Sequence, residues 1–143
     1  MSEQSTGSET FSVVLFSGTD DKLTAASILV AGAAALGKHV DVMLQYWALE
    51  AFRCSRIDAD HGLVTEAKGE GSAALWRASE RRTYHHWSDT LRQAKDIGEV
   101  RIHACAHSMG IFGLDQKDLD PIVDDVTGVA TFLASADGQV VFI

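Results

Sequence analysis

The apolar run at residues 11–16 constrains the fold of this chain more than any other segment. Its sequence, FSVVLF, is nearly continuous in apolar residues and ends at Ser17, Gly18 and Thr19. Strands that are buried on both faces have such runs and occur mainly in parallel sheets. Thr19 and the two aspartates after it are residue types that begin helices, and an alanine-rich segment then runs to Gly37, a typical residue at a helix end. The segment therefore predicts a central parallel strand followed by a helix.

The alternation of strand and helix patterns continues along most of the chain. Trp87, Leu91, Ala94 and Ile97 are spaced as one face of an amphipathic helix, and Gly98 closes it. Other patterns predict a strand at 39–45, a helix at 46–53, a strand from 100 onward, a turn and short helix at 114–121, a strand at 122–126, a helix at 128–136 and a strand at 140–143. This alternation predicts an α/β fold with three layers around a mainly parallel sheet of about five strands.

Length and charge limit the domain organisation and the partners. The 143 residues suit a single domain, which we expect at residues 11–143 after a disordered tail at 1–10. Glycines and mixed charges interrupt the patterns at about 55–84, which predicts a variable insertion there. The net charge of −8, from 12 basic and 20 acidic residues, repels phosphates and therefore argues against nucleic-acid binding.

No segment of the sequence predicts export or membrane insertion. The largely apolar segment at 25–36 is shorter than the ~20 residues that span a bilayer, and the N-terminus lacks the basic and apolar regions of a signal peptide. We therefore expect a cytoplasmic protein in which Cys54 and Cys105 are free thiols. Their spacing fits neither a zinc ribbon nor a thioredoxin motif.

The best candidate for chemistry is Cys105, which lies between His103 and His107. In an extended strand these three side chains, with Arg101, share one face, while the other face is apolar. Cysteine is often a buried core residue, so the alternative is a structural thiol. The neighbouring histidines, and the loop that follows at the end of a parallel strand, favour a functional thiol.

Two features of the sequence would favour a thiolate at Cys105. A helix that begins near His107 would direct its amides to the sulfur, and a protonated histidine would add a positive charge. His107 is the better placed histidine, because His103 is equally well explained as a core or interface residue. A metal site is less favoured, since the outer two of these side chains lie ~13 Å apart along a strand, too far to share one zinc.

Three further features are secondary. Ser17, Gly18 and Thr19 lie where a strand meets a helix N-terminus, a setting that suits an anion and equally a simple turn. Cys54 is expected to be a buried core thiol. The alternative is that it resolves a sulfenate or persulfide on Cys105. Five arginines form a local basic excess that would attract an anionic sulfur donor or an acidic partner. Each of them is also explained as an ordinary solvent-exposed side chain. They are Arg53, Arg56, Arg77, Arg81 and Arg82.

Residues 104–114, ACAHSMGIFGL, resemble the cysteine loop of DsrE/DsrF-like proteins, the sulfur-relay family, in which a cysteine precedes a Ser-Met pair and a later Gly-Ile or Gly-Leu. The segments at 15–18, 21–22, 31–38, 46–49, 128–134 and 141–143 follow in the order that this family has. The resemblance covers residues 11–54 and 85–143. His107 and Gly110 depart from it, because a methionine and an aspartate are expected there.

The resemblance implies a flavodoxin-like subunit that assembles into homotrimers or homohexamers and carries sulfur as a persulfide on Cys105. Ser108 and Met109 match the Ser-Met pair and are candidate ligand-binding residues. The expected partners are sulfur donor and acceptor proteins or small thiols, and no cofactor is expected.

Three hypotheses about function follow from the sequence. The first is an intracellular sulfur carrier or sulfurtransferase acting through Cys105. The second is a non-catalytic oligomeric module that binds a metal or small ligand through the His/Cys stripe. The third is a thiol peroxidase that depends on both cysteines.

Overall fold

The computed structural model describes residues 9–64, 74, 76–78 and 85–143. They form an all-parallel sheet of five strands in the order β4-β3-β2-β1-β5. The strands are β1 (Thr10–Leu15), β2 (His39–Leu44), β3 (Val100–Cys105), β4 (Asp125–Thr127) and β5 (Val140–Phe142). The helices are α1 (Asp20–Ala35), α2 (Tyr46–Ala51), α4 (Trp87–Ile97), α5 (Ala106–Phe112) and α6 (Val129–Ala134), with a 3₁₀ turn at Gln116–Asp118. The predicted α/β fold with a five-stranded parallel sheet is confirmed.

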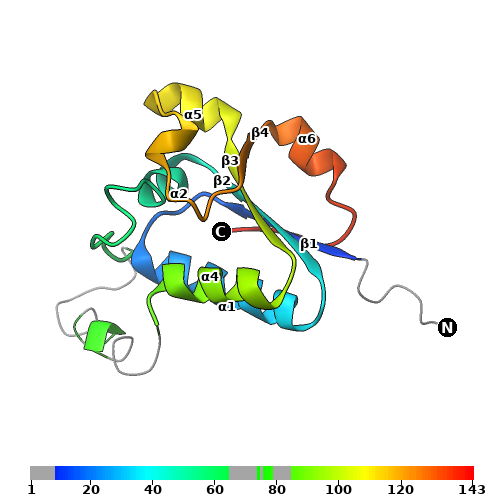
Figure 1. Ribbon diagram of the computed structural model, residues 1–143. Coiled ribbons are helices and arrows are strands. Elements are labelled where there is room, and N and C mark those ends of the chain that lie inside the picture. The colour runs from blue at the N-terminus through cyan, green and yellow to red at the C-terminus, as the bar shows by residue number, and fades with distance from the viewer. Residues whose placement is uncertain (1–8, 65–73, 75, 79–84) are drawn as a thin grey trace.

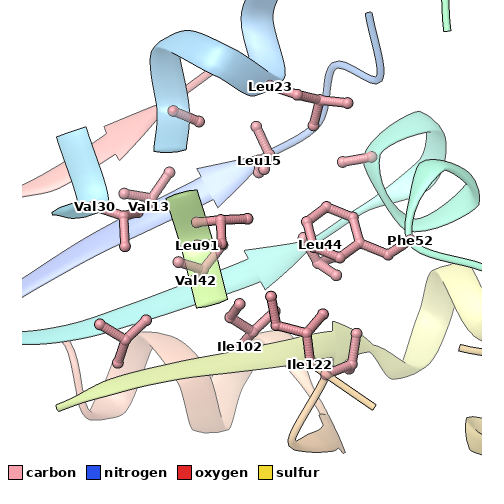
Figure 2. Close-up of a cluster of buried hydrophobic side chains, with 14 of the residues drawn as sticks. Val13, Leu15, Leu23, Val30, Val42, Leu44, Phe52, Leu91, Ile102 and Ile122 are labelled. Carbon is pink, nitrogen blue, oxygen red and sulfur yellow. The ribbon is translucent and has the colours of Figure 1, made fainter. Parts of the chain in front are cut away.

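Helices cover the two faces of the sheet unequally. α1 and α4 lie side by side against one face, and α6 lies across the other (Figure 1). Most of the core fills the space between the sheet and the α1/α4 layer (Figure 2). Its labelled members are Val13, Leu15, Leu23, Val30, Val42, Leu44, Phe52, Leu91, Ile102 and Ile122.

The core on the α6 side of the sheet is much smaller. Met43, Cys105 and Phe132 are buried there, with Val14 packed against them. Phe132 is the one buried residue of α6, whose other side chains are exposed. Cys105 is therefore covered by a thin layer, and the predicted site lies on this face.

The order of the strands reverses at β1. Strands β2, β3 and β4 are added in turn on one side of β1, whereas β5 pairs with its other side. In open α/β sheets ligands commonly bind beyond the carboxyl ends of the strands at such a reversal. The loop after β1, which contains Ser17, Gly18 and Thr19, occupies this position.

The structure differs from three local predictions. β3 ends at Cys105, so His107 belongs to α5 and not to the strand. β4 covers Asp125–Thr127 and not 122–126, because Ile122 and Val123 are buried in a turn in which the amide of Val123 donates to Asp120. Thr19 occupies the N-cap position of α1, yet its side chain makes no capping hydrogen bond.

The expected insertion at 55–84 is described only in part. Residues 55–59 form turns and a bend, residues 60–64 belong to no helix or strand, and residues 74 and 76–78 are helical. Residues 65–73, 75 and 79–84, which include Arg81 and Arg82, lie outside the described part of the chain. Within the described part, no helix combines the length and apolar character needed to cross a membrane.

Candidate functional site

Cys105 is the last residue of β3 and the residue directly before α5. Side chains alternate along the strand: Val100, Ile102 and Ala104 are buried in the main core, while Arg101, His103 and Cys105 face the other way. The predicted polar stripe is therefore present up to Cys105. The backbone of Cys105 is still extended, with φ −70° and ψ 119°, so this residue marks the change from strand to helix.

The side chain of Cys105 is shielded from solvent. It is 1% exposed and packs with Met43 and Phe132 in the small core beneath α6. The sequence favoured a functional thiol over a buried core residue, and the structure shows the thiol buried.

His103 is held between two carboxylates on the same face. Its Nδ1 lies 2.6 Å from Oδ1 of Asp125, and its Nε2 lies 2.7 Å from Oδ1 of Asp41. An ionised carboxylate only accepts hydrogen bonds, so the protonated ring, which has an N–H at both nitrogens, satisfies both contacts. The hydrogen bond to Asp41 raises the pKa of His103 above 6.5 and outweighs the opposing effect of burial, and Asp125 raises it further.

Asp125 joins this histidine to the edge strand β4. Burial raises the pKa of Asp125, but hydrogen bonds from His103 and Thr127 outweigh it and leave the pKa below its usual value. Arg101 also contacts this carboxylate at 3.4 Å. When His103 is protonated, two carboxylates face two cations, and the cluster of Asp41, His103, Asp125 and Arg101 has no net charge. We call these four residues the His103 cluster.

The sequence did not identify Asp41 or Asp125 as parts of the site. Asp41 alternates with apolar residues in β2, which places it on the α6 side of that strand. Only the register of the sheet shows that His103 lies opposite Asp125 and that Cys105 lies opposite Thr127. This information is not local, so a pattern within one strand does not contain it.

The other predicted site residues after Cys105 differ in their surroundings. His107 is exposed on α5. Ser108 is fully buried, and its hydroxyl accepts a hydrogen bond of 3.2 Å from the amide of Tyr46, which has a positive φ of 46°. Met109 is 6% exposed and belongs to the main core. Ser108 and Met109 therefore join α5 to α2 and to the core in this structure.

Ser17, Gly18 and Thr19 line a separate cleft of about 650 Å³. The cleft also has Lys22, Trp47, Glu50, Arg56 and His61 in its walls, and Cys105 is not among them. The structure therefore divides the predicted residues between two places: a buried thiol beneath α6, and a cleft beyond β1 and β2.

Cys54 is exposed, so its expected place in the core is wrong. It lies in the turn after α2, where its sulfur is 3.9 Å from the carbonyl oxygen of Lys117. α2 ends at Ala51, so Cys54 lies in the turn after the helix and not on its packed side. Both cysteines are free. Within residues 9–64 and 85–143, no group of three or more His, Cys, Asp or Glu side chains is arranged to hold a metal ion.

Comparisons with known proteins agree with the fold and with the resemblance in the sequence. Residues 7–74 match the sequence model of the DsrE/DsrF/DrsH-like family. This match runs through part of the expected insertion and ends before β3. The chain is also 27% identical to the uncharacterized protein YrkE of Bacillus subtilis over 147 residues, which is 87% of this chain and 89% of that protein.

Two solved structures share the fold. The ychN protein of E. coli is 16% identical and superposes with a TM-score of 0.54, covering 94% of this chain and 99% of its own. A protein of unknown function, MTH1491 from Methanobacterium thermoautotrophicum, is 15% identical with a TM-score of 0.52 and the same coverage. These two likenesses show the fold, and the match over residues 7–74 supports the resemblance of the chain to the DsrE/DsrF/DrsH-like family.

Proposed function

We propose that this protein is a sulfur carrier that holds sulfane sulfur as a persulfide on Cys105 and passes it to an acceptor thiol. The observation that carries the proposal is the position of Cys105: it ends a parallel strand and is covered on the sheet surface by one aromatic side chain, Phe132. The name of the sulfur-relay family to which the chain is similar supports the same chemistry.

The proposed transfer consists of two displacement reactions at sulfur. The Cys105 thiolate attacks the outer sulfur of a donor persulfide, R–S–SH, forming a new S–S bond while the donor S–S bond breaks. The electron pair of the broken bond leaves with the donor as a thiolate, R–S⁻. This thiolate takes up the proton that the Cys105 thiol released when it ionised. An acceptor thiolate then attacks the outer sulfur on Cys105 in the same way. The sum consumes no oxidant or reductant, because one persulfide and one thiol become another persulfide and thiol.

The buried position of Cys105 suits a carrier more than a peroxidase. A persulfide is reactive, and a cover that excludes water and small reductants extends its lifetime. The cover must also open for the donor and the acceptor. α6 has six residues and buries only Phe132, so it is held by few contacts and opens at low cost.

His103 has a positioning role in this proposal. Both of its ring nitrogens are engaged by carboxylates, so it has no N–H free to donate to the sulfur of Cys105. Its hydrogen bonds join β2, β3 and β4 and thereby fix Thr127 beside Cys105 in the sheet register. Exposed His107 has no contact that links it to Cys105.

Assembly of several copies belongs to the same proposal. Large apolar side chains are exposed on α6 and β5, among them Leu133 at 51% and Phe142 at 66%. Exposed apolar side chains that gather near an edge strand favour association. We propose that the protein forms a homotrimer or homohexamer and acts in the cytoplasm. Light scattering of the purified protein gives the molar mass of the assembly and thereby tests the number of copies.

The test of the proposed function is the loading of sulfur. After incubation with cysteine persulfide and removal of the excess, intact-mass spectrometry is expected to show an adduct of about 32 Da, one sulfur atom. The adduct is expected in Cys54→Ser and absent in Cys105→Ser. An adduct that persists in Cys105→Ser, or no adduct in the wild type, contradicts the proposal.

A further inference from the structure

The cleft beyond β1 and β2 has the size and position of a ligand site. Its volume of about 650 Å³ lies within the range of roughly 300–1,000 Å³ that is usual for small-molecule sites. It lies where the strand order reverses at β1, next to the loop of residues 17–19 and to α2. Cys105 does not line it, so the sulfur chemistry proposed above leaves the cleft without a function.

Among the described residues, the walls of the cleft carry two cations, Lys22 and Arg56, and one carboxylate, Glu50. Lys22 and Arg56 are exposed there, and neither makes an ion pair with any residue of the described part of the chain. Glu50, the one glutamate among the described wall residues, is contacted instead by Arg53 at 3.4 Å. Two such cations in a protein with a net charge of −8 favour an anionic occupant.

Two residues in the walls have buried polar atoms that lack hydrogen-bond partners. These atoms are Oγ1 of Thr19 and Nε2 of His61. Buried polar atoms in proteins nearly always have partners, and an exception calls for a water molecule or a ligand. The hydroxyl of an N-cap threonine normally accepts a bond from the helix, whereas that of Thr19 does not.

The helix N-terminus itself does not make the site. Asp20 and Asp21 already occupy the first turn of α1, and Asp21 accepts hydrogen bonds from the amides of Lys22 and Val64. The positive charge of the cleft therefore comes from its side chains.

One wall of the cleft is rigid and aromatic. The loop after β1 touches α2 closely: a Cβ on Gly18 would lie 2.4 Å from the carbonyl oxygen of Trp47, and the amide of Ala48 donates to Phe16. Trp47 is 57% exposed, although its ring packs against Phe112 at a centroid distance of 5.9 Å. This exposed indole offers a flat apolar surface beside the cations.

We infer that this cleft binds a small organic anion with two negative charges and an aromatic or apolar body. Lys22 and Arg56 pair with the charged group, and Trp47 packs against the body. The site goes beyond the proposed function, because its occupation requires no sulfur on Cys105.

The test uses three probes that separate charge from apolar surface. Phenyl phosphate has both, inorganic phosphate has the charge alone, and phenol has the ring alone. Isothermal titration calorimetry is expected to show saturable binding of phenyl phosphate, weaker binding of phosphate and no measurable binding of phenol. Equal affinity for phenyl phosphate and phosphate would contradict a role for the aromatic wall, and no binding of phenyl phosphate at millimolar concentrations would overturn the proposal.

Variants locate the binding in the cleft. Lys22→Met and Arg56→Met each remove one exposed charge and are expected to weaken phenyl phosphate binding by about tenfold or more, as the loss of a charged partner does. Lys38→Met, before β2 and paired with Glu9, is the matched control and is expected to leave binding unchanged. Equal effects of all three variants would show nonspecific attraction and refute the site.

The result is independent of the sulfur-carrier proposal. Cys105→Ser is expected to bind phenyl phosphate as the wild type does, while losing the sulfur adduct. Loss of phenyl phosphate binding in Cys105→Ser would contradict the separation of the two sites.

Discussion

Replacement of Phe132 tests whether one side chain of α6 controls access to Cys105. Phe132 is 4% exposed and is the buried residue of α6, so opening of the helix exposes this ring to water. Full burial of a phenylalanine side chain contributes about 1.5–3 kcal/mol. An opening that costs this much leaves about one molecule in 10 to one in 150 open at any moment.

The assay measures the rate at which Cys105 reacts with an aromatic disulfide reagent, in a Cys54→Ser background. Because only open molecules react, native protein is expected to react about 10 to 150 times more slowly than the same protein unfolded in urea. Phe132→Ala removes the cover and is expected to bring the native rate close to the unfolded rate. Circular dichroism confirms that the variant stays folded.

Leu133→Ala is the matched control, because Leu133 is the next residue of α6 and is 51% exposed. It is expected to leave the labelling rate of Cys105 unchanged. A native rate more than about a thousandfold slower than the unfolded rate would refute the reasoning, because access would then require far more than the opening of one side chain. A change of less than about twofold in Phe132→Ala would refute it as well.

Two further predictions concern stability. Because the pKa of His103 is raised above 6.5, the proton stabilises the folded state below about pH 6.5 and this contribution is lost as the pH rises through the raised pKa. Urea unfolding is therefore expected to show that the difference in free energy of unfolding between wild type and His103→Asn shrinks from pH 6 to pH 9. The control His107→Asn, at an exposed position, is expected to follow wild type throughout. A difference that stays constant with pH would contradict a protonated His103. Gly18→Ala is expected to lower the free energy of unfolding by about 1–3 kcal/mol, because the added Cβ lies 2.4 Å from the carbonyl oxygen of Trp47. An unchanged urea midpoint would show that the loop after β1 is not in contact with α2.

Local patterns were sufficient to predict most elements of the fold. The apolar run of β1 fits a strand that is buried on both faces, and the stripe from Trp87 to Ile97 fits one face of a helix. Both elements form where expected. Prediction was weaker where the element itself is short. Three residues of β4 give too few alternations to fix its start, so the apolar Ile122 and Val123 were assigned to the strand although they lie in a turn.

The candidate site was predicted in part for a related reason. Cys105 and His103 share a face because of alternation within one strand, which a sequence shows directly. The partners of His103 come from β2 and β4, and their positions depend on the register between strands. The burial of Cys105 depends on Phe132, which follows it by 27 positions in sequence and reaches it only because α6 crosses the sheet.

Transfer of isotopically labelled sulfur through Cys105 tests the central claim most directly. Protein loaded with heavy-sulfur persulfide and freed of donor is mixed with an acceptor thiol, and mass spectrometry follows the label on both. The proposal predicts that the label leaves Cys105 and appears on the acceptor in equal amount, and that Cys105→Ser transfers none. Label that stays on Cys105 in the presence of acceptor, or that reaches the acceptor without Cys105, would contradict a sulfur-carrier function.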